Sequence, residues 1–221
     1  MRRWGPSIVV VALLGATAVA FATTERQKLE KSPFGVLHVD RTVSPKLAAA
    51  TIELRFGRPH LVTLQIVDEQ DRVVAALASE QRVEPGTTRF RWAAKDVRDG
   101  IYRPKLTLDT GREFTLQNPI RVDSVAPRAA LVWYRPHVLR RRVKPRVLIS
   151  YRLSEPANVL VYVNGKQQIR GGHTKREDEV EWFARRDGHR LRRGRYRLQL
   201  AAVDLAGNIG PRTHAFVVRV R

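Results

Sequence analysis

Cysteine is absent from the 221 residues of the chain. Its absence excludes disulfide bridges, thiolate metal sites and a cysteine nucleophile, and it leaves the redox compartment undetermined. The protein must therefore rely on a hydrophobic core, and 43% of its residues are apolar. A chain of this length is long enough for one large or two small domains, each with a core of its own.

Motifs of catalysis and phosphate binding are also missing. There is no Gly-x-Ser-x-Gly, and the glycines after Arg170 lack the Lys-Ser/Thr and the following helix of a phosphate loop. The carboxylates show no signature of an acid and base pair, and no two of the six histidines have metal-ligand spacing. Asp204 and Asn208 could offer oxygen ligands to Ca²⁺, but turn chemistry explains them equally well. We predict that the protein is not an enzyme and has no catalytic residue, cofactor or metal; an exported enzyme without a recognisable motif is an alternative.

Negative charge is scarce, because 21 Asp and Glu stand against 41 Lys and Arg, a formal net charge of +20. Most of the excess falls in residues 128–221, which hold 22 basic and seven acidic side chains. A field of this sign attracts polyanions, within a screening length of roughly 8–10 Å at physiological salt. A merely solvated basic surface is the plain interpretation, and polyanion binding is the functional one.

The first 24 residues carry charge only at Arg2 and Arg3. As a helix, residues 4–24 would extend roughly 31 Å, just enough to cross the hydrocarbon core of a bilayer. The two arginines favour an N-terminus on the inside, so the remainder should be extracytoplasmic. We predict a signal-anchor helix over residues 1–24. A secreted protein, cleaved after Ala22 at the small-x-small pattern Ala20-Phe21-Ala22, is the alternative.

One arrangement of residues occurs twice in the chain. Trp92 is followed by Asp99-Gly100-Ile101-Tyr102, and Trp182 is followed by Arg193-Gly194-Arg195-Tyr196. In each copy an alternating strand ends at the Trp, the Gly allows the chain to reverse, and a second strand begins at the Tyr. The Trp and Tyr stand on the apolar phase of their strands, so we expect them in the cores.

The predicted fold is all-β: two tandem immunoglobulin-like (Ig-like) β-sandwiches that follow one N-terminal transmembrane or signal helix. Short strands about 8–12 residues apart, with turn residues between them and no sustained helical period, indicate this class. A charged segment broken by Pro and Gly is expected to form a juxtamembrane stalk, and Asp123–Pro127 marks the boundary between the sandwiches. The expected division is residues 1–24 for the helix, 25–45 for the stalk, 46–126 for the first sandwich and 127–221 for the second, strongly basic one.

The first repeat combines Val62-x-Leu64-x-Ile66-x-Asp68, a polar turn, Val73-Val74, Trp92 and Asp99-Gly100-x-Tyr102. In this order it resembles the Ig-like domain of the flagellar hook-capping protein (FlgD-type), a module that also occurs in bacterial envelope proteins. The second repeat, above all Asp204–Asn208, looks like a broader group of bacterial Ig-like domains. The charged run Thr24–Pro33 resembles the juxtamembrane region of membrane-anchored FlgD-type proteins. The resemblance implies a non-flagellar protein of the cell envelope.

Two basic clusters of the second half are candidate polyanion contacts. They consist of Arg140, Arg141, Arg142 and Lys144, and of Arg185, Arg186, Arg190, Arg192 and Arg193. Non-specific nucleic-acid binding uses such charge together with exposed aromatic rings, and Trp133 stands beside the first cluster. The predicted export argues against nucleic acid, so we interpret the clusters as contacts to anionic lipid head groups or to an anionic envelope polymer.

These observations predict a membrane-anchored, extracytoplasmic Ig-like protein with a structural or interaction role. The expected partners are the membrane, through residues 4–24, and a protein that the sequence does not name. The alternative is a secreted or anchored polyanion-binding module that acts through the basic second sandwich.

The anchor is testable by fractionation. Because residues 4–24 are uncharged and long enough to span a bilayer, the protein should remain with membranes after carbonate extraction and keep its N-terminal residues. Protease added from outside should reach the β-sandwiches. A mature N-terminus at Thr23 would show instead that the segment is cleaved.

Overall fold

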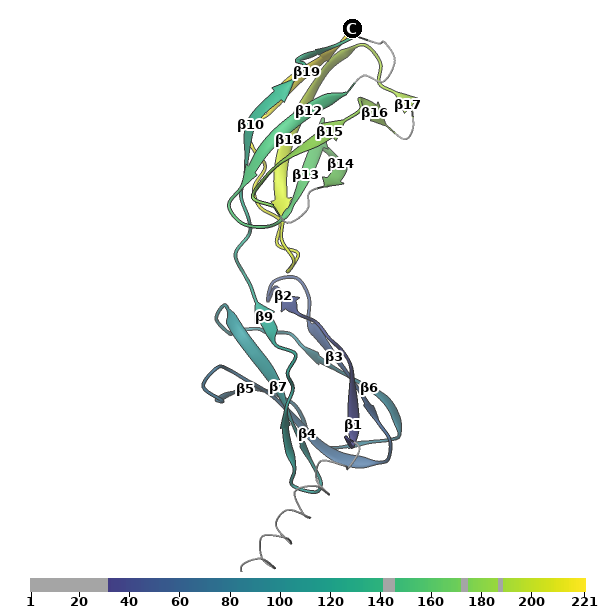
Figure 1. The fold of residues 1–221 in the computed structure, drawn as a ribbon, viewed down its shortest axis with the longest axis vertical. Coiled ribbons are helices and arrows are strands. Elements are labelled where there is room, and N and C mark those ends of the chain that lie inside the picture. Colours follow the sequence, from purple (N-terminus) through teal and green to yellow (C-terminus); the bar gives the residue numbers. More distant parts are fainter. Residues whose placement is uncertain (1–31, 141–145, 172–174, 187–188) are drawn as a thin grey trace, which may run out of the picture.

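The computed structural model describes residues 32–140, 146–171, 175–186 and 189–221, and every regular element within them is a β-strand (Figure 1). The all-β prediction is therefore confirmed for this part of the chain. The expected helix over residues 1–24 lies outside the described residues. Within the described ranges no helix is long and apolar enough to cross a membrane.

Residues 34–122 form two facing sheets, which we call the N-terminal unit. One sheet has the order β1 (Phe34–Val39), β3 (Ala50–Phe56), β6 (Gly86–Trp92). The other has the order β2 (Thr42–Val43), β9 (Ile120–Val122), β7 (Gly100–Leu108), β4 (His60–Val67), β5 (Val73–Val83), with β8 (Glu113–Thr115) also paired to β7.

Residues 129–220 form a second pair of sheets, the C-terminal unit. Its three-stranded sheet has the order β10 (Ala129–Arg135), β12 (Val147–Leu153), β15 (Glu177–Trp182). Its five-stranded sheet has the order β11 (Val138–Leu139), β19 (Phe216–Val220), β18 (Gly194–Val203), β13 (Asn158–Val163), β14 (Lys166–Gly171). A small hairpin joins β16 (Arg185–Arg186) to β17 (His189–Arg190).

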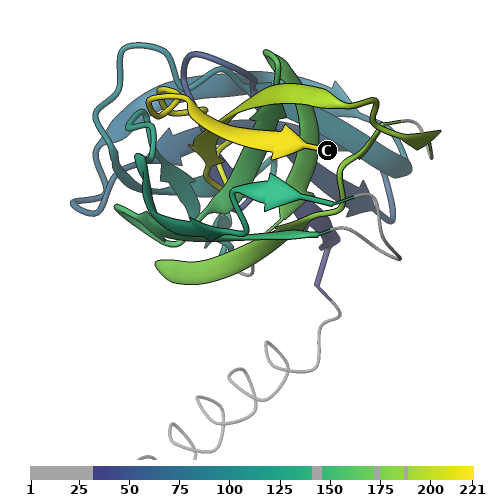
Figure 2. The same cartoon turned by 90° about the horizontal axis from the view of Figure 1, so that it is seen from above.

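The two units share one strand order. In each, the first, third and sixth strands, or their counterparts, make the small sheet, and a two-residue strand runs parallel to the last strand of the other sheet. Two sheets with this arrangement make an Ig-like β-sandwich. The repeat that the sequence indicates is therefore a repeat of topology, and Figure 2 shows the C-terminal unit in front of the N-terminal unit when the molecule is seen from above.

Each unit has its own hydrophobic cluster, because alternate side chains of every long strand point between its sheets. In β12, for example, Val147, Ile149, Tyr151 and Leu153 are buried while the residues between them are not. Trp92 and Trp182 are buried as expected. Their rings lie 5.3 Å from the Tyr102 ring and 6.1 Å from the Tyr196 ring, respectively.

Both repeated tyrosines also make the same hydrogen bond. The Tyr102 hydroxyl donates to the Arg98 carbonyl, and the Tyr196 hydroxyl donates to the Arg192 carbonyl, each at 2.8 Å. A tyrosine that bonds to the backbone four residues upstream, at the start of this strand, is the tyrosine corner of Ig-like domains. The recurrence of Gly-x-Tyr in the sequence thus has a structural reason, since the corner ties the incoming loop to the strand.

The expected stalk over residues 25–45 needs correction. Phe34–Val39 pairs with β3 along its length, and Thr42–Val43 pairs with β9. Phe34, Val39 and Val43 are buried in the first core. The sandwich therefore begins at about residue 34 instead of 46. Val36–Val39 could be expected as a short strand from its apolar residues, but its place in the first sandwich depends on pairing with β3. Residues 25–31 lie outside the described part.

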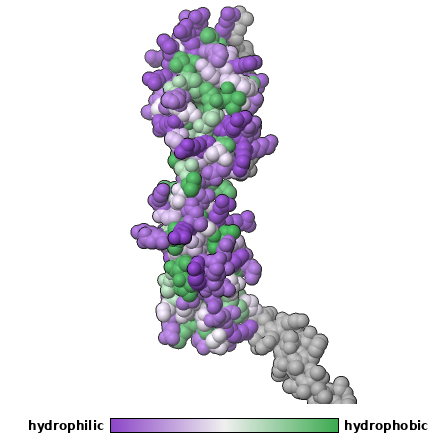
Figure 3. Space-filling view, turned by 90° about the vertical axis from the view of Figure 1, so that its left-hand side faces the viewer, coloured by the Kyte–Doolittle hydropathy of each residue, from purple (hydrophilic) through white to green (hydrophobic). Residues whose placement is uncertain are grey.

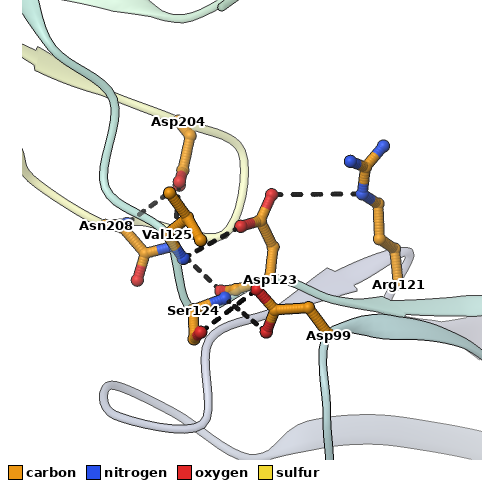
Figure 4. Close-up of polar contacts among 7 residues, drawn as sticks. All are labelled: Asp99, Arg121, Asp123, Ser124, Val125, Asp204 and Asn208. Atoms are coloured by element: carbon orange, nitrogen blue, oxygen red, sulfur yellow. Dashed lines mark hydrogen bonds and ion pairs between the residues drawn. The ribbon is translucent and has the colours of Figure 1, made fainter.

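Polar groups join the two units at the junction (Figure 4). The amide of Asn208, which lies in the turn after β18, donates to the Asp123 carbonyl at 2.9 Å and accepts from the Ser44 hydroxyl at 2.6 Å. Within the turn, the Asn208 backbone and side-chain amides both donate to the Asp204 carboxylate at 2.8 Å. Gly210 lies so close to the Pro127 carbonyl that an added Cβ would collide with it. The turn therefore packs against both the linker and the first unit.

The tyrosine corners predict that removing either hydroxyl lowers the stability of its own unit. Tyr102→Phe and Tyr196→Phe remove only the hydroxyl, so each should lower the free energy of unfolding by about 0.5–1.5 kcal/mol, the net value of a hydrogen bond. Urea denaturation measures this. Tyr162→Phe is the control, since the Tyr162 hydroxyl has no hydrogen-bond partner in the described ranges, and it should cost less than either. Equal effects of all three substitutions would contradict the role of the corner.

The revised boundary predicts which fragments fold. Fragments 32–126 and 127–221 should each give β-type circular dichroism and a cooperative melt, because each contains one complete core. Fragment 46–126 should fail, since it lacks Phe34, Val39 and Val43, and burying three such side chains contributes roughly 5–9 kcal/mol against a total stability of about 5–15 kcal/mol. A cooperative melt of fragment 46–126 would show that residues 25–45 are a stalk after all.

Candidate functional site

Among the described residues, exposed positive charge is concentrated on the outer face of β18 and β19. The two strands are antiparallel, with Arg195 directly opposite Arg219. Because Leu198, Leu200 and Val218 are fully buried, alternation sends the neighbouring side chains outward. We call the resulting set the arginine face; it comprises Arg193, Arg195, Arg197, Arg219 and Arg221, all of which are exposed.

Two adjoining hollows run along this face. The first, of about 450 Å³, is lined by Arg193, Gly194, Arg195, Arg219, Val220 and Arg221. The second, of about 370 Å³, is lined by Asn164, Arg195, Arg197, Ala215 and Val217. Arg195 lines both, so the two shallow hollows adjoin along the strands, and we call them together the groove.

A type I′-like turn borders the groove at the end near Arg197. Asn164 and Gly165 have φ values of 48° and 81°, as both central residues of such a turn require. The Asn164 side chain accepts a hydrogen bond from the Arg197 backbone at 2.9 Å, which holds the turn against β18. Next to the turn, the Arg212 guanidinium lies 3.8 Å from the centre of the Tyr162 ring, a cation–π contact that places one more positive charge there.

The acidic side chains that the structure describes in the C-terminal unit lie away from the arginine face. On the opposite, three-stranded sheet, Glu177 pairs with Arg152, and Glu181 pairs with Arg146 at 2.7 Å. Two further acids, Glu155 and Asp204, lie toward the junction, where burial and then the charges of Asp123 and Asp204 raise the pKa of the Glu155 carboxyl. Among the described residues, no carboxylate pairs with an arginine of the face.

Repulsion between its own charges therefore destabilises the arginine face. Arg195 and Arg219 are directly opposed like charges, an arrangement that destabilises a sheet by a fraction of a kcal/mol. Exposed guanidinium groups present five donors each and bind phosphate, sulfate or carboxylate groups bidentately. An anion in the groove would relieve the repulsion and replace the water that now hydrates these donors.

The structure places the predicted contact residues at several points of the C-terminal unit. Arg193 lines the first hollow. Arg140 follows β11, whose Leu139 carbonyl accepts a hydrogen bond from the Arg221 backbone, so Arg140 borders the same end of the face. Arg185 and Arg192 are exposed, and Arg186 and Arg190 belong to the hairpin of β16 and β17. Arg141, Arg142 and Lys144 lie outside the described residues.

Four arginines of the face were missed by the search for charge clusters: Arg195, Arg197, Arg219 and Arg221. They are separated in the sequence by apolar residues, so they do not form a run. The signal that could have found them is the strand alternation itself, since every second residue of both strands is basic at one end. Their meeting across the two strands depends on register, which the sequence does not reveal.

Other potential sites are occupied by structural contacts. The buried His60 ring bonds to Asp109 at 2.9 Å, which lowers the pKa of the Asp109 carboxyl. The Asn208 side chain is occupied by hydrogen bonds to Ser44, Asp123 and Asp204. The turn that could have offered Ca²⁺ ligands therefore serves a structural purpose. Within the described ranges, no group of three His, Cys, Asp or Glu side chains is arranged to hold a metal ion.

On the side drawn in Figure 3, hydrophobic residues gather in the middle of the C-terminal unit, and hydrophilic residues surround them. The larger exposed apolar side chains of the C-terminal unit, in the part that the structure describes, are Val132, Val138, Phe183, Leu205 and Ile209. None of them belongs to β18 or β19. The arginine face is thus a polar binding surface and not a hydrophobic one.

No protein-family model and no curated protein matches the sequence. Among solved structures, the fibronectin(III)-like modules of Clostridium thermocellum CbhA are 12% identical with a TM-score of 0.48, over 85% of this chain and 94% of that chain. The FN1–FN3 domains of chicken CNTN1 are 12% identical with a TM-score of 0.44, over 83% and 66%. The Ig1–2 module of Drosophila DLAR is 12% identical with a TM-score of 0.27, over 86% and 100%. The strand order of its sheets makes this chain an Ig-like β-sandwich protein.

Proposed function

We propose that the protein is an extracytoplasmic interaction module of the cell envelope that binds polyanions through the arginine face. The observation that supports this is the pair of adjoining hollows on β18 and β19, lined by exposed arginines for which the described residues supply no acidic partner. Such a groove attracts anions by Coulomb steering and holds them by charge-assisted hydrogen bonds. Binding of this kind needs no catalytic group.

The proposal includes the anchor. Residues 4–24 hold the chain in the membrane with the sandwiches on the extracytoplasmic side, in the manner of the non-flagellar, FlgD-type Ig-like proteins that the first repeat resembles. An Ig-like sandwich is a rigid scaffold that can position binding residues toward a partner. In this protein the presented surface is the arginine face, so the structural role and the polyanion-binding role belong to one molecule.

The proposed function predicts salt-sensitive binding of dextran sulfate to a soluble form of residues 32–221. Arg195→Gln/Arg219→Gln should weaken binding about tenfold at low salt, because two surface ion pairs together contribute about 1.4 kcal/mol. Fluorescence anisotropy at several salt concentrations measures the effect. The double variant should melt no lower than the parent, since it removes a pair of opposed like charges.

The matched control is Arg146→Gln/Arg152→Gln. It removes the same charge from the same unit, but on the opposite sheet, where both arginines already pair with glutamates. Affinity for dextran sulfate should change much less than in the variant of the face. Equal losses in the two variants would show that net charge alone drives binding, and absence of binding by the parent would reject the proposed function.

A further inference from the structure

The arginine face has a repeat that can be compared with the repeat of a ligand. Side chains on one face of a strand recur every two residues, about 6.7 Å apart, and neighbouring strands lie about 4.8 Å apart. Arg195 and Arg197 follow one another on β18, while Arg219 and Arg221 follow one another along and just beyond β19. The register pairs Arg195 with Arg219 and, when it is continued, Arg193 with Arg221. We call each position along the strands where arginines face outward a level. The groove therefore offers three successive levels of positive charge.

These levels follow one another along the strands. Arg193 and Arg221 make the first level, Arg195 and Arg219 the second, and Arg197 the third, beside the turn at Asn164. Three levels span about 13 Å. Arg212, stacked on Tyr162 and within 3.5 Å of the Gly165 carbonyl, continues the positive charge past the turn. A single small anion could occupy only one level, whereas an extended polyanion could contact all of them.

The position of the arginine face in the molecule favours a polymer over a bilayer as its ligand. The long axis of the molecule runs from the start of β1 at one end to the C-terminus at the other (Figure 1). Strands β7 and β18 have nine and ten residues, so each unit is about 30 Å long and the two together about 60 Å. A bilayer that holds the N-terminal end of an upright molecule therefore lies many screening lengths, about 8 Å each, from the arginine face.

The chemistry of the face also disfavours lipid. Proteins that bind bilayer surfaces usually insert apolar or aromatic side chains beside their basic residues. In the part of the chain that the structure describes, the large exposed apolar neighbour of the face is Val138 on β11, in register with Arg219. The smaller Ala215 and the half-buried Val217 line the second hollow. These side chains would bury little area in a bilayer, whereas shallow hollows lined by arginines fit a narrow chain.

We infer that the arginine face binds a linear polyol phosphate, a phosphodiester chain without bases that carries one negative charge about every 7 Å and lies along β18 and β19. The aromatic rings of these strands, Tyr196 and Phe216, pack toward the core, so the face offers a base no ring to stack on. This inference rests on the proposed function and names the class of its ligand. A phosphodiester chain with a three-carbon spacer has six bonds per repeat, about 7 Å when extended, so successive phosphates meet successive levels. Each phosphate receives bidentate hydrogen bonds from the guanidinium groups at its level.

The test compares one head-group chemistry in three forms: glycerol 3-phosphate, oligomers of glycerol phosphate with one to eight units, and vesicles of phosphatidylglycerol. Residues 32–221 are titrated with each form by calorimetry, at equal phosphate concentration. Because linked phosphates bind at high effective concentration, affinity should rise at least about tenfold from one to three units. Beyond three or four units it should grow only slowly, since the groove has no further level.

Single substitutions at the two ends of the groove sharpen the test. Arg197→Gln and Arg221→Gln should each weaken binding of the eight-unit oligomer, while neither should remove the binding of glycerol 3-phosphate, which needs one level alone. Arg152→Gln, on the opposite sheet, is the control and should leave the length dependence unchanged. All three variants alter exposed side chains, and circular dichroism verifies their fold.

The outcomes separate this inference from the proposed function. Binding of dextran sulfate without any length dependence for glycerol phosphate would overturn the linear polyanion and leave polyanion binding in place. Vesicles that bind as tightly as the eight-unit oligomer would identify a lipid surface and overturn it too. Oligo(dT) of equal charge that binds more tightly than the oligomer would identify a nucleic acid and also overturn it. Absence of binding to every anionic probe would reject the proposed function itself.

Discussion

The period-two alternation of β-strand side chains is the constraint on which the rest of the protein depends. Leu198, Leu200 and Val218 must point into the second core, where they are fully buried. The residues between them are therefore forced outward, and at one end of both strands those residues are arginines. Burying a leucine contributes about 1.5–3 kcal/mol, whereas an opposed pair of like charges costs less than about 1 kcal/mol. The core thus decides the phase, and the arginine face follows from it.

Because its charges are segregated, the C-terminal unit presents its positive charge on one side. The three-stranded sheet balances its arginines with glutamates, as in the pair of Arg146 with Glu181. The five-stranded sheet has basic residues at its distal end and, within the described ranges, no carboxylate to neutralise them. An excess of the same size spread evenly would bind anions weakly everywhere. Concentrated on one groove, it gives the molecule one side that a polyanion can recognise.

The junction determines where that side is presented. Asn208 bridges the linker, through the Asp123 carbonyl, and the first unit, through the Ser44 hydroxyl. Both partners are short side chains or backbone groups, which lose little conformational freedom when they are held. Gly210 leaves room for the Pro127 carbonyl, so a side chain at this position would push the linker away. These contacts hold the two units end to end, with the groove far from the start of β1.

The sequence alone determined the fold class, the repeat and the core aromatics. Alternation in strands such as Val147–Leu153, the turn at Asn164-Gly165 and the recurrence of Trp and Gly-x-Tyr are local features, and local features carry these properties. The segment before residue 46 was misjudged because Phe34–Val39 is a short edge strand, whose pairing with β3 is a contact between distant residues. The tertiary structure alone decided the candidate site. Arg195 and Arg219 are 24 residues apart in the chain and oppose one another only through the register of two antiparallel strands, and register depends on the packing of both strands against a common core.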